Sequence, residues 1–140
     1  MSPDRHALVE LARRACTRAH APYSGIYVGA AIRSATGALY AGTNVENAAY
    51  PIGNCAEVSA IAAGVAAEGG NFRIAETAVW AVDSDGRAIP ISPCGGCRQR
   101  IREFAADGAV RVHFPWQGGA LRTASIDELL PFAFELPSRG

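Results

Sequence analysis

The chain has 140 residues, of which 49% are apolar, 19% charged and 8% aromatic. That length is typical of one domain, so we expect a single domain over residues 1–140, and the composition excludes a disordered or fibrous chain. Thirteen basic residues, all arginine, balance thirteen acidic ones. A net charge of zero argues against a nucleic-acid partner and an anionic membrane surface, and the lack of lysine excludes mechanisms that need a lysine Schiff base.

No apolar run reaches the roughly 18 residues of a membrane span, and the first residues lack the apolar core of a signal peptide. We therefore expect a cytoplasmic protein with no membrane partner. In that compartment the four cysteines (Cys16, Cys55, Cys94 and Cys97) stay reduced. Cysteines of this kind more often bind metal or take part in catalysis than form disulfides.

The first half of the chain predicts two helices around a hairpin. Apolar residues recur at helical spacing before Pro22, which disfavours helical geometry at the residue that precedes it. Two apolar segments follow on either side of Gly37, and an alanine-rich stretch then ends at Gly69. The expected elements are a helix over residues 4–19, strands over 26–32 and 38–45, and a helix over 55–67.

The second half predicts alternating strands and helices. A segment rich in β-branched and aromatic residues indicates a central strand, and the Ser125-Ile-Asp-Glu128 capping box indicates the start of a last helix. The other expected elements are a strand over residues 74–82, a helix over 98–106, and strands over 109–114 and 120–123. This order predicts an α/β fold with helices on both faces of one sheet.

Two short motifs at predicted helix starts favour a zinc site. Cys94 and Cys97 stand three residues apart at one helix start, where free N–H groups and the positive helix end favour thiolates. Cys55 opens the other helix, with Glu57 two residues later. If the two helix starts face each other, three thiolates can hold one zinc ion and leave its fourth position open, as in catalytic zinc sites.

Glu57 is the candidate for proton transfer in such a site. Zinc lowers the pKa of a bound water from about 16 to about 7, but an amine leaving group still needs a proton, which a carboxylate beside the metal can carry. No histidine lies near either motif to complete a closed site. The three histidines, His6, His20 and His113, are interpreted as structural or surface residues, and Cys16 as a core residue.

Each motif alone carries little information. A single Cys-x-x-Cys is compatible with a redox pair or with half of a structural zinc site. Cys-x-Glu at one helix start and Pro-Cys-x-x-Cys at the next, with a strand between them, is the cysteine form of the zinc-deaminase signature. A non-catalytic zinc domain that binds nucleosides or partners is the minor alternative, and the neutral charge and short loops disfavour nucleic-acid editing.

Over nearly its whole length the sequence resembles the small, homotetrameric, zinc-dependent cytidine deaminases. The matching segments are Ala21-Pro-Tyr-Ser24, Val28-Gly-Ala-Ala31, Asn44-Val-Glu-Asn-Ala48, Cys55-Ala-Glu57, Ser92-Pro-Cys-Gly-Gly-Cys-Arg-Gln99 and Glu128-Leu-Leu-Pro131. The resemblance implies a three-layer α/β/α fold with one mixed sheet of about five strands. It also implies hydrolytic deamination of cytidine or deoxycytidine, with release of ammonia, in pyrimidine salvage.

The resemblance assigns a role to each site residue. Cys55, Cys94 and Cys97 would hold one Zn²⁺ per subunit, with Glu57 as the proton shuttle. Substrate contacts are implied for Asn44 and Glu46 with the ribose 3′-hydroxyl, the Ala56 N–H with the base carbonyl, and the carbonyls near Ser92 and Pro93 with the amine. The family builds each site across subunit boundaries, which implies a homotetramer with Tyr50 and Phe134 at neighbouring sites. Without the motifs, Asn44 and Glu46 would be interpreted as turn-forming residues, and Tyr50 and Phe134 as core residues.

Three positions depart from the family pattern. Ile26 stands where an aromatic residue usually packs against the pyrimidine, a loss of roughly 0.5–1.5 kcal/mol beyond area burial. Val58 stands where many three-cysteine members have an arginine that donates to the zinc thiolates. Three thiolates on a dication carry a net charge of −1, so another donor compensates or the site is tuned differently. Asn54 replaces an apolar residue and either caps the helix or contacts a substrate.

These departures leave two substrate classes. Cytidine or deoxycytidine is the leading interpretation, because the ribose motif is intact. The alternative is another aminated heterocycle or modified nucleoside, as for the blasticidin S deaminases. Those proteins are similar in the Cys-Ala-Glu and Ser-Pro-Cys-Gly-x-Cys segments but depart more in the nucleoside motif.

Overall fold

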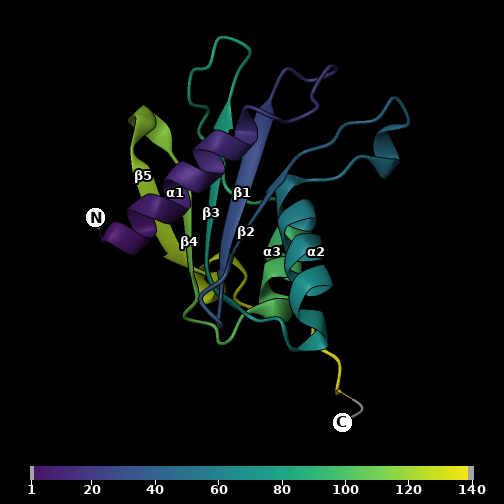
Figure 1. Cartoon of the computed structure of the whole chain (residues 1–140), viewed down its shortest axis with the longest axis vertical. Coiled ribbons are helices and arrows are strands. Elements are labelled where there is room, and N and C mark those ends of the chain that lie inside the picture. Colours follow the sequence, from purple (N-terminus) through teal and green to yellow (C-terminus); the bar gives the residue numbers. More distant parts are fainter. Residues whose placement is uncertain (1, 139–140) are drawn as a thin grey trace.

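The computed structural model describes residues 2–138, which form one sheet with helices on both of its faces (Figure 1). In chain order the elements are α1 (Pro3–Cys16), β1 (Tyr27–Ser34), β2 (Leu39–Thr43), α2 (Ala56–Glu68), β3 (Ile74–Val82), α3 (Gly95–Phe104), β4 (Arg111–Pro115), β5 (Leu121–Ser125) and α4 (Ile126–Leu129). Within the described residues, no helix is long and apolar enough to cross a membrane.

The sheet has five strands in the order β2-β1-β3-β4-β5. β3 and β4 are parallel, and the other neighbouring strands are antiparallel. The predicted three-layer α/β/α architecture with one mixed sheet is confirmed. The central strand has the predicted bounds, and the other four strands and α2 shift by one or two residues at their ends.

The first helix is shorter than predicted, because it ends at Cys16 and not at residue 19. The Cys16 thiol donates to the Arg13 carbonyl at 2.9 Å and the Thr17 hydroxyl donates to the Arg14 carbonyl at 2.8 Å. These side chains satisfy carbonyls that a longer helix would bond through its backbone, so the chain can leave the helix at this point.

The prediction for the third helix was wrong at both ends, since α3 runs from Gly95 to Phe104 and not over 98–106. Two glycines at its start lower its intrinsic helix propensity. The helix forms there nonetheless, because the Arg98 N–H donates to the Cys94 carbonyl at 2.9 Å and closes the first turn. Cys94 is therefore the N-cap residue, and Cys97 lies in the first turn.

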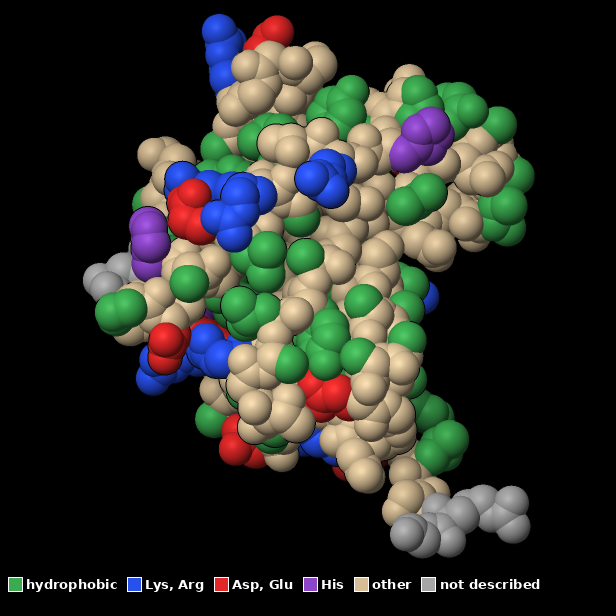
Figure 2. All heavy atoms as spheres, in the orientation of Figure 1, with side chains coloured by type: hydrophobic (Ala, Val, Ile, Leu, Met, Phe, Trp, Pro, Cys, Tyr) green, Lys and Arg blue, Asp and Glu red, His purple; other side chains and the backbone are tan. Residues whose placement is uncertain are grey.

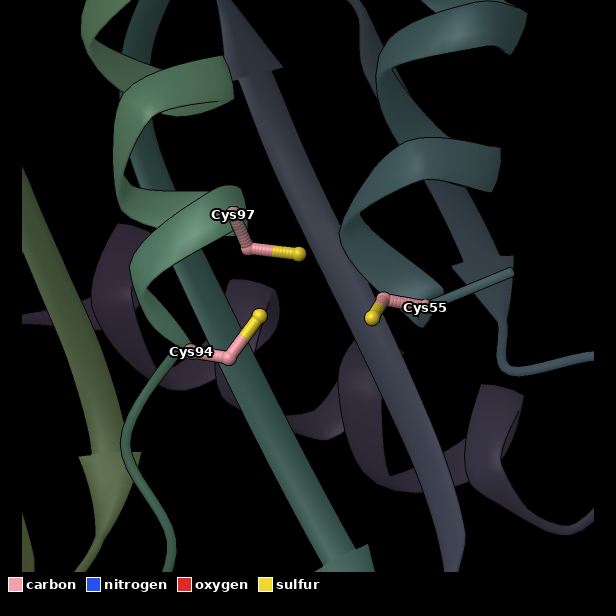
Figure 3. A group of neighbouring side chains, drawn as sticks. All are labelled: Cys55, Cys94 and Cys97. Atoms are coloured by element: carbon pink, nitrogen blue, oxygen red, sulfur yellow. The ribbon is translucent and has the colours of Figure 1, made fainter. Parts of the chain in front are cut away.

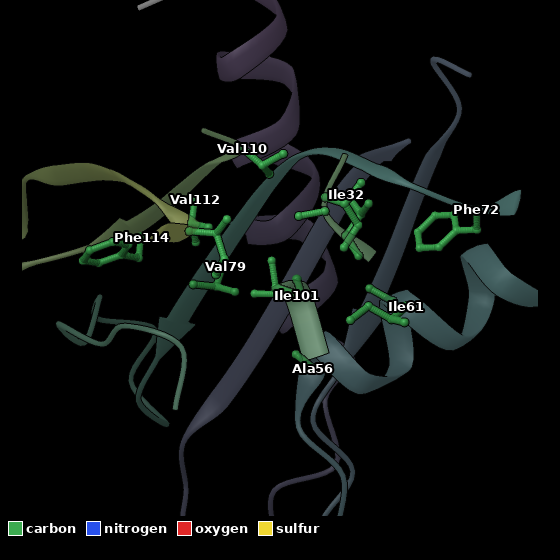
Figure 4. Close-up of a cluster of buried hydrophobic side chains, with 14 residues drawn as sticks. Ile32, Ala56, Ile61, Phe72, Val79, Ile101, Val110, Val112 and Phe114 are labelled. Atoms are coloured by element: carbon green, nitrogen blue, oxygen red, sulfur yellow. The ribbon is translucent and has the colours of Figure 1, made fainter. Parts of the chain in front are cut away.

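Each face of the sheet has its own hydrophobic cluster. Helix α1 covers one face, where Cys16 is buried as predicted. Helices α2 and α3 cover the other face over a larger cluster (Figure 4), whose buried side chains include Ile32, Ile61, Phe72, Val79, Ile101, Val112 and Phe114. The two helices that carry the cysteine motifs are thus packed side by side on the same face.

A glycine on the edge strand lets α2 lie close to the sheet. A Cβ atom on Gly42 would lie 2.4 Å from the Ala60 nitrogen and 2.7 Å from the Ala56 carbonyl oxygen, both in the backbone of α2. The backbone atoms of a helix cannot move aside from such a contact as the end of a flexible side chain can. Gly42 therefore allows the close approach that places the N-terminus of α2 beside the sheet.

The α1 face also buries a polar group. The fully buried His113 on β4 contacts Thr123 Oγ1 through Nδ1, at 2.7 Å, and Glu76 through Nε2, and Glu76 pairs with Arg33. Burial and then the positive charge of nearby arginines, Arg5 foremost, lower the pKa of His113 to about 4. The neutral ring then donates from Nε2 to Glu76 and accepts at Nδ1 from Thr123. His113 is the structural histidine that the sequence predicts, while His6 and His20 are exposed.

His113 makes the stability of the protein depend on pH. Its folded pKa lies below the unfolded value of about 6.5, so the unfolded chain takes up this proton first as the pH falls. Its contribution is complete above about pH 6.5 and is lost toward pH 4, by about 2 kcal/mol between pH 7.5 and pH 5. Urea unfolding at both pH values should show this loss in the wild type and a smaller loss in His113→Asn. Equal losses would contradict the assignment.

Candidate functional site

Three cysteine side chains converge where the N-termini of α2 and α3 meet (Figure 3). Cys55 is the N-cap residue of α2, Cys94 is that of α3, and Cys97 follows in the first turn of α3. Their sulfur atoms all lie within 4.8 Å of one another. The sulfurs point toward a common centre, so the side chains need only small rotations to bind one ion.

The pKa values of Cys55 and Cys97 are shifted in opposite directions. Hydrogen bonds from Cys97 and Cys94 lower the pKa of Cys55 to about 6, against the opposing effect of burial. The pKa of Cys97 is raised because its thiol donates to the Cys55 sulfur and is buried. The group therefore holds one thiolate readily, while further thiolates need a positive charge among them. A divalent ion that accepts sulfur ligands, such as zinc, meets this requirement.

Glu57 is the second residue of α2 and lines the cavity that opens beside the cysteines. Its side chain is 5% exposed, and burial, reinforced by the negative charge of Cys55, raises the pKa of its carboxyl group. A buried carboxyl group with a raised pKa can take up and return a proton near neutral pH. Glu57 therefore combines the position and the acidity that proton transfer beside a metal requires.

A cavity of about 600 Å³ opens beside the cysteines, which is a volume typical of small-molecule sites. Most of the site residues predicted from the sequence line it: Ile26, Asn44, Glu46, Tyr50, Cys55, Ala56, Glu57, Ser92 and Cys94. Cys97 and Pro93 are buried and do not line it. Phe134 is also outside the cavity and is 68% exposed. The interpretation of Phe134 and Tyr50 as core residues is wrong, because both are exposed, Tyr50 to 73%.

Other residues of the cavity were missed from the sequence. They are Tyr23, Ser24, Val28, Val45, Asn47, Gly53 and Ile91. Most belong to or adjoin the motifs at 21–24 and 44–48, which were the available signal, whereas Ile91 reaches the cavity only through the fold. Asn54 lines the cavity too, and it does not cap α2, since Cys55 is the N-cap residue.

Asn44 and Glu46 brace the segment that leads into β1. The Asn44 amide accepts from the Val28 N–H and donates to the Ile26 carbonyl, both at 2.8 Å. Glu46 accepts from the Tyr23 and Ser24 N–H groups at 3.0 and 3.1 Å and from the Ser24 hydroxyl, which lowers the pKa of Glu46. The interpretation of Asn44 and Glu46 as residues that shape the local backbone is thus correct. Each still has an unused donor or lone pair, and both residues line the cavity.

Two consecutive residues of α3 fix the segments around the cysteines. Arg98 donates to three acceptors at 2.8–2.9 Å, which are the carbonyls of Pro93 and Leu129 and the Ser92 hydroxyl. The Gln99 amide donates to the Phe134 carbonyl at 2.8 Å and accepts from the Phe134 N–H at 3.1 Å. Arg98 thereby holds the loop before Cys94, and Gln99 holds the C-terminal segment.

The comparison with known proteins identifies the family. The zinc-binding region of cytidine and deoxycytidylate deaminases matches residues 2–113. The chain belongs to this deaminase family. The deaminase is 36% identical over 131 residues to a cytidine deaminase of Sporosarcina psychrophila, covering 94% of this chain and 91% of that protein. It is 37% identical over 132 residues to one of Halalkalibacterium halodurans, covering 94% of each.

Solved structures agree with this assignment. The crystal structure of a cytidine deaminase from Burkholderia pseudomallei matches the deaminase with a TM-score of 0.80 and 39% identity, covering 96% of this chain and 100% of that one. That from Mycobacterium tuberculosis matches with a TM-score of 0.75 and 32% identity, covering 96% and 100%. Zinc is the cofactor of this deaminase, and the three converging cysteines are a group that can hold it.

Cys97→Ala should remove zinc, because it takes away one of the three sulfur atoms of the group that can hold the ion. We expect metal analysis of the purified variant to find almost no zinc, with activity lost in parallel. Cys16→Ala is the matched control, since that thiol is buried in the cluster between α1 and the sheet and lies outside the cysteine group. A fully zinc-loaded Cys97→Ala protein would contradict the three-cysteine site.

Proposed function

We propose that this deaminase hydrolyses cytidine or deoxycytidine to uridine or deoxyuridine, with release of ammonia. The observation that carries the proposal is that one cavity joins the cysteine group and Glu57 to the Asn44 and Glu46 side chains. Similarity to proteins named cytidine deaminase over nearly the whole chain supports the same substrate. We further propose that residues 1–140 form a single deaminase domain.

In this proposal Cys55, Cys94 and Cys97 are the zinc ligands and Glu57 moves the protons. When bound, zinc supplies a water molecule of lowered pKa at the open side of the cysteine group. The Glu57 carboxylate would take one proton from that water, hold it on a carboxyl oxygen and deliver it to the ring nitrogen as the remaining hydroxide adds to the carbon that bears the amine. It would then take the second proton from the added hydroxyl group and deliver it to the amine as the carbon–nitrogen bond breaks and ammonia leaves. The low exposure of Glu57 keeps bulk water from competing for this proton.

The remaining cavity residues would orient the nucleoside. Asn44 and Glu46 hydrogen-bond the ribose 3′-hydroxyl with the donor and lone pairs that their structural bonds leave free. The Ala56 N–H lies in the first turn of α2, where backbone N–H groups have no helical partner, and it binds the base carbonyl. The carbonyls near Ser92 and Pro93 receive the amine, and Ile26 packs against the pyrimidine.

A second candidate substrate class is favoured by two cavity residues. Ile26 presents an aliphatic surface, and Asn54 adds a polar side chain to the lining. An amide in this position can hydrogen-bond a base or sugar that carries additional polar groups. The alternative is therefore deamination of another aminated heterocycle or a modified nucleoside by the same zinc and Glu57 chemistry.

Ammonia release by the zinc-loaded protein tests the function. We expect turnover of cytidine or deoxycytidine, with free cytosine as a poor substrate because it lacks the ribose. Glu57→Ala should retain zinc and lose about 10²–10⁴-fold in kcat, the range for general acid–base catalysis. Strong turnover only of another aminated heterocycle would overturn the substrate but not the mechanism. Near-normal turnover by Glu57→Ala would instead show that the proton shuttle is assigned to the wrong residue.

We also propose a homotetramer with shared sites. Apolar side chains gather on the segment that projects between β2 and α2 (Figure 2), where Tyr50 and Ile52 are 73% and 66% exposed. Phe132 and Phe134 are exposed near the C-terminus, where Gln99 holds the backbone of Phe134 and leaves its ring outward. Exposed apolar groups of this kind are typical of subunit interfaces. Tyr50 and Phe134 would then approach neighbouring sites.

Light scattering on the purified protein should give about four times the mass of one chain. A monodisperse monomer would contradict the shared sites and the roles of Tyr50 and Phe134 in them.

We propose pyrimidine salvage as the pathway, and the cytoplasm as the location, since three zinc-binding cysteines need reducing conditions to remain thiolates.

A further inference from the structure

The zinc-loaded cysteine group carries an excess of negative charge. Three thiolates and one Zn²⁺ sum to −1, and a negative site makes the metal a poorer Lewis acid unless nearby cations or donors offset the charge. The residue after Glu57, Val58, has neither a charge nor a side-chain donor. A charged side chain that offsets the thiolates would therefore have to come from another residue.

Helix α3 presents three arginines, and two of them are already engaged. Arg98 donates to Ser92, Pro93 and Leu129, and Arg102 lies 3.5 Å from Asp127 and 3.7 Å from Glu135. Arg100 has no ion pair and no side-chain hydrogen bond with any of the residues that the structure describes. Its guanidinium group is the one of the three that is free to act on the cysteines.

The Arg100 side chain folds back over the first turn of α3. A Cβ atom on Gly96 would lie 3.0 Å from Arg100 Nη1, so the guanidinium group rests against Gly96. Gly96 stands between Cys94 and Cys97, and residues four apart are neighbours on a helix surface. The arginine charge is therefore held at the turn that carries two of the three ligands.

The influence of Arg100 extends across to α2. Its positive charge is felt at Cys55 and at Glu57, which lie at the N-terminus of α2, although other influences on both groups are larger. Arg100 thus places a charge at the first turn of α3 that reaches the facing end of α2. Figure 3 shows how closely the ends of these two helices approach at the sulfurs.

We propose that Arg100 offsets the negative charge of the zinc-loaded cysteine group, and that Gly96 leaves the space for its side chain to do so. Arg100 is a positioning and tuning residue, since it acts on the metal site through its charge and touches no substrate in this assignment. The proposal rests on zinc being the cofactor of the proposed deaminase, and it names the group that takes the place of a donor at residue 58.

Zinc affinity, measured by competition with a chelator, tests the proposal without any substrate. The measurement is made at the same pH and the same low salt concentration for every variant. Arg100→Gln should bind zinc about three- to tenfold more weakly at low salt, the size of effect that one exposed unit charge on the same helix turn gives in a largely aqueous setting. Arg100→Lys, which keeps the charge, should recover part of the affinity.

Two controls separate an electrostatic effect from a structural one. Arg102→Gln removes the same charge from the same helix but at a residue paired with Asp127 and Glu135, and it should leave zinc affinity unchanged. In 1 M salt, where charges are screened beyond about 3 Å, the difference between wild type and Arg100→Gln should largely disappear. Unfolding in urea checks that the exposed Arg100 can be replaced without loss of the fold.

The outcomes are distinct. Equal zinc affinity of wild type and Arg100→Gln at low salt, or equal weakening by Arg102→Gln, would overturn the proposal. An affinity loss that persists in 1 M salt would also overturn it, since the effect would then not be one of charge. If Arg100→Gln weakens zinc binding as expected while cytidine is not deaminated, the proposed substrate fails and the role of Arg100 stands.

Discussion

The whole site depends on the N-terminal ends of α2 and α3 meeting on one face of the sheet. Each end supplies an N-cap cysteine, and the third cysteine follows one turn into α3. The hydrophobic cluster beneath the two helices and the close approach at Gly42 hold those ends in place. Without that packing, Cys55 and the Cys94–Cys97 pair would be separate short motifs with no common metal. The core of this protein is thus what turns three thiols into one zinc site.

Several polar residues at the site serve the fold and the proposed chemistry together. Asn44 and Glu46 hold the segment before β1, and the same two side chains line the cavity where the ribose is proposed to bind. Arg98 likewise holds the loop that carries Ser92 and Pro93. A cavity built from residues that are already hydrogen-bonded is rigid before substrate arrives, so little ordering entropy is left for binding to pay.

Helix α3 distributes different tasks along consecutive residues. Arg98 fixes the loop before Cys94, Gln99 fixes the C-terminal segment, and Arg100 is proposed to offset the thiolate charge. A helix can do this because neighbouring positions point in different directions, about 100° apart. The proposed role of Arg100 would also supply, from the facing helix, a charge that Val58 does not offer from α2.

The sequence alone determined the family, the central strand over 74–82, the order of the elements and the cysteines with Glu57, because short motifs and apolar periodicity depend on neighbours along the chain. It misplaced the ends of α1 and α3, because side-chain bonds at Cys16 end the first helix early and the Arg98 N–H closes a first turn of α3 whose two glycines disfavour a helix. Only the tertiary structure decided that Asn54 lines the cavity, that Phe134 is exposed, and that Arg100 lies at the cysteine turn. Those facts depend on which side chains packing leaves free, and no local pattern records that.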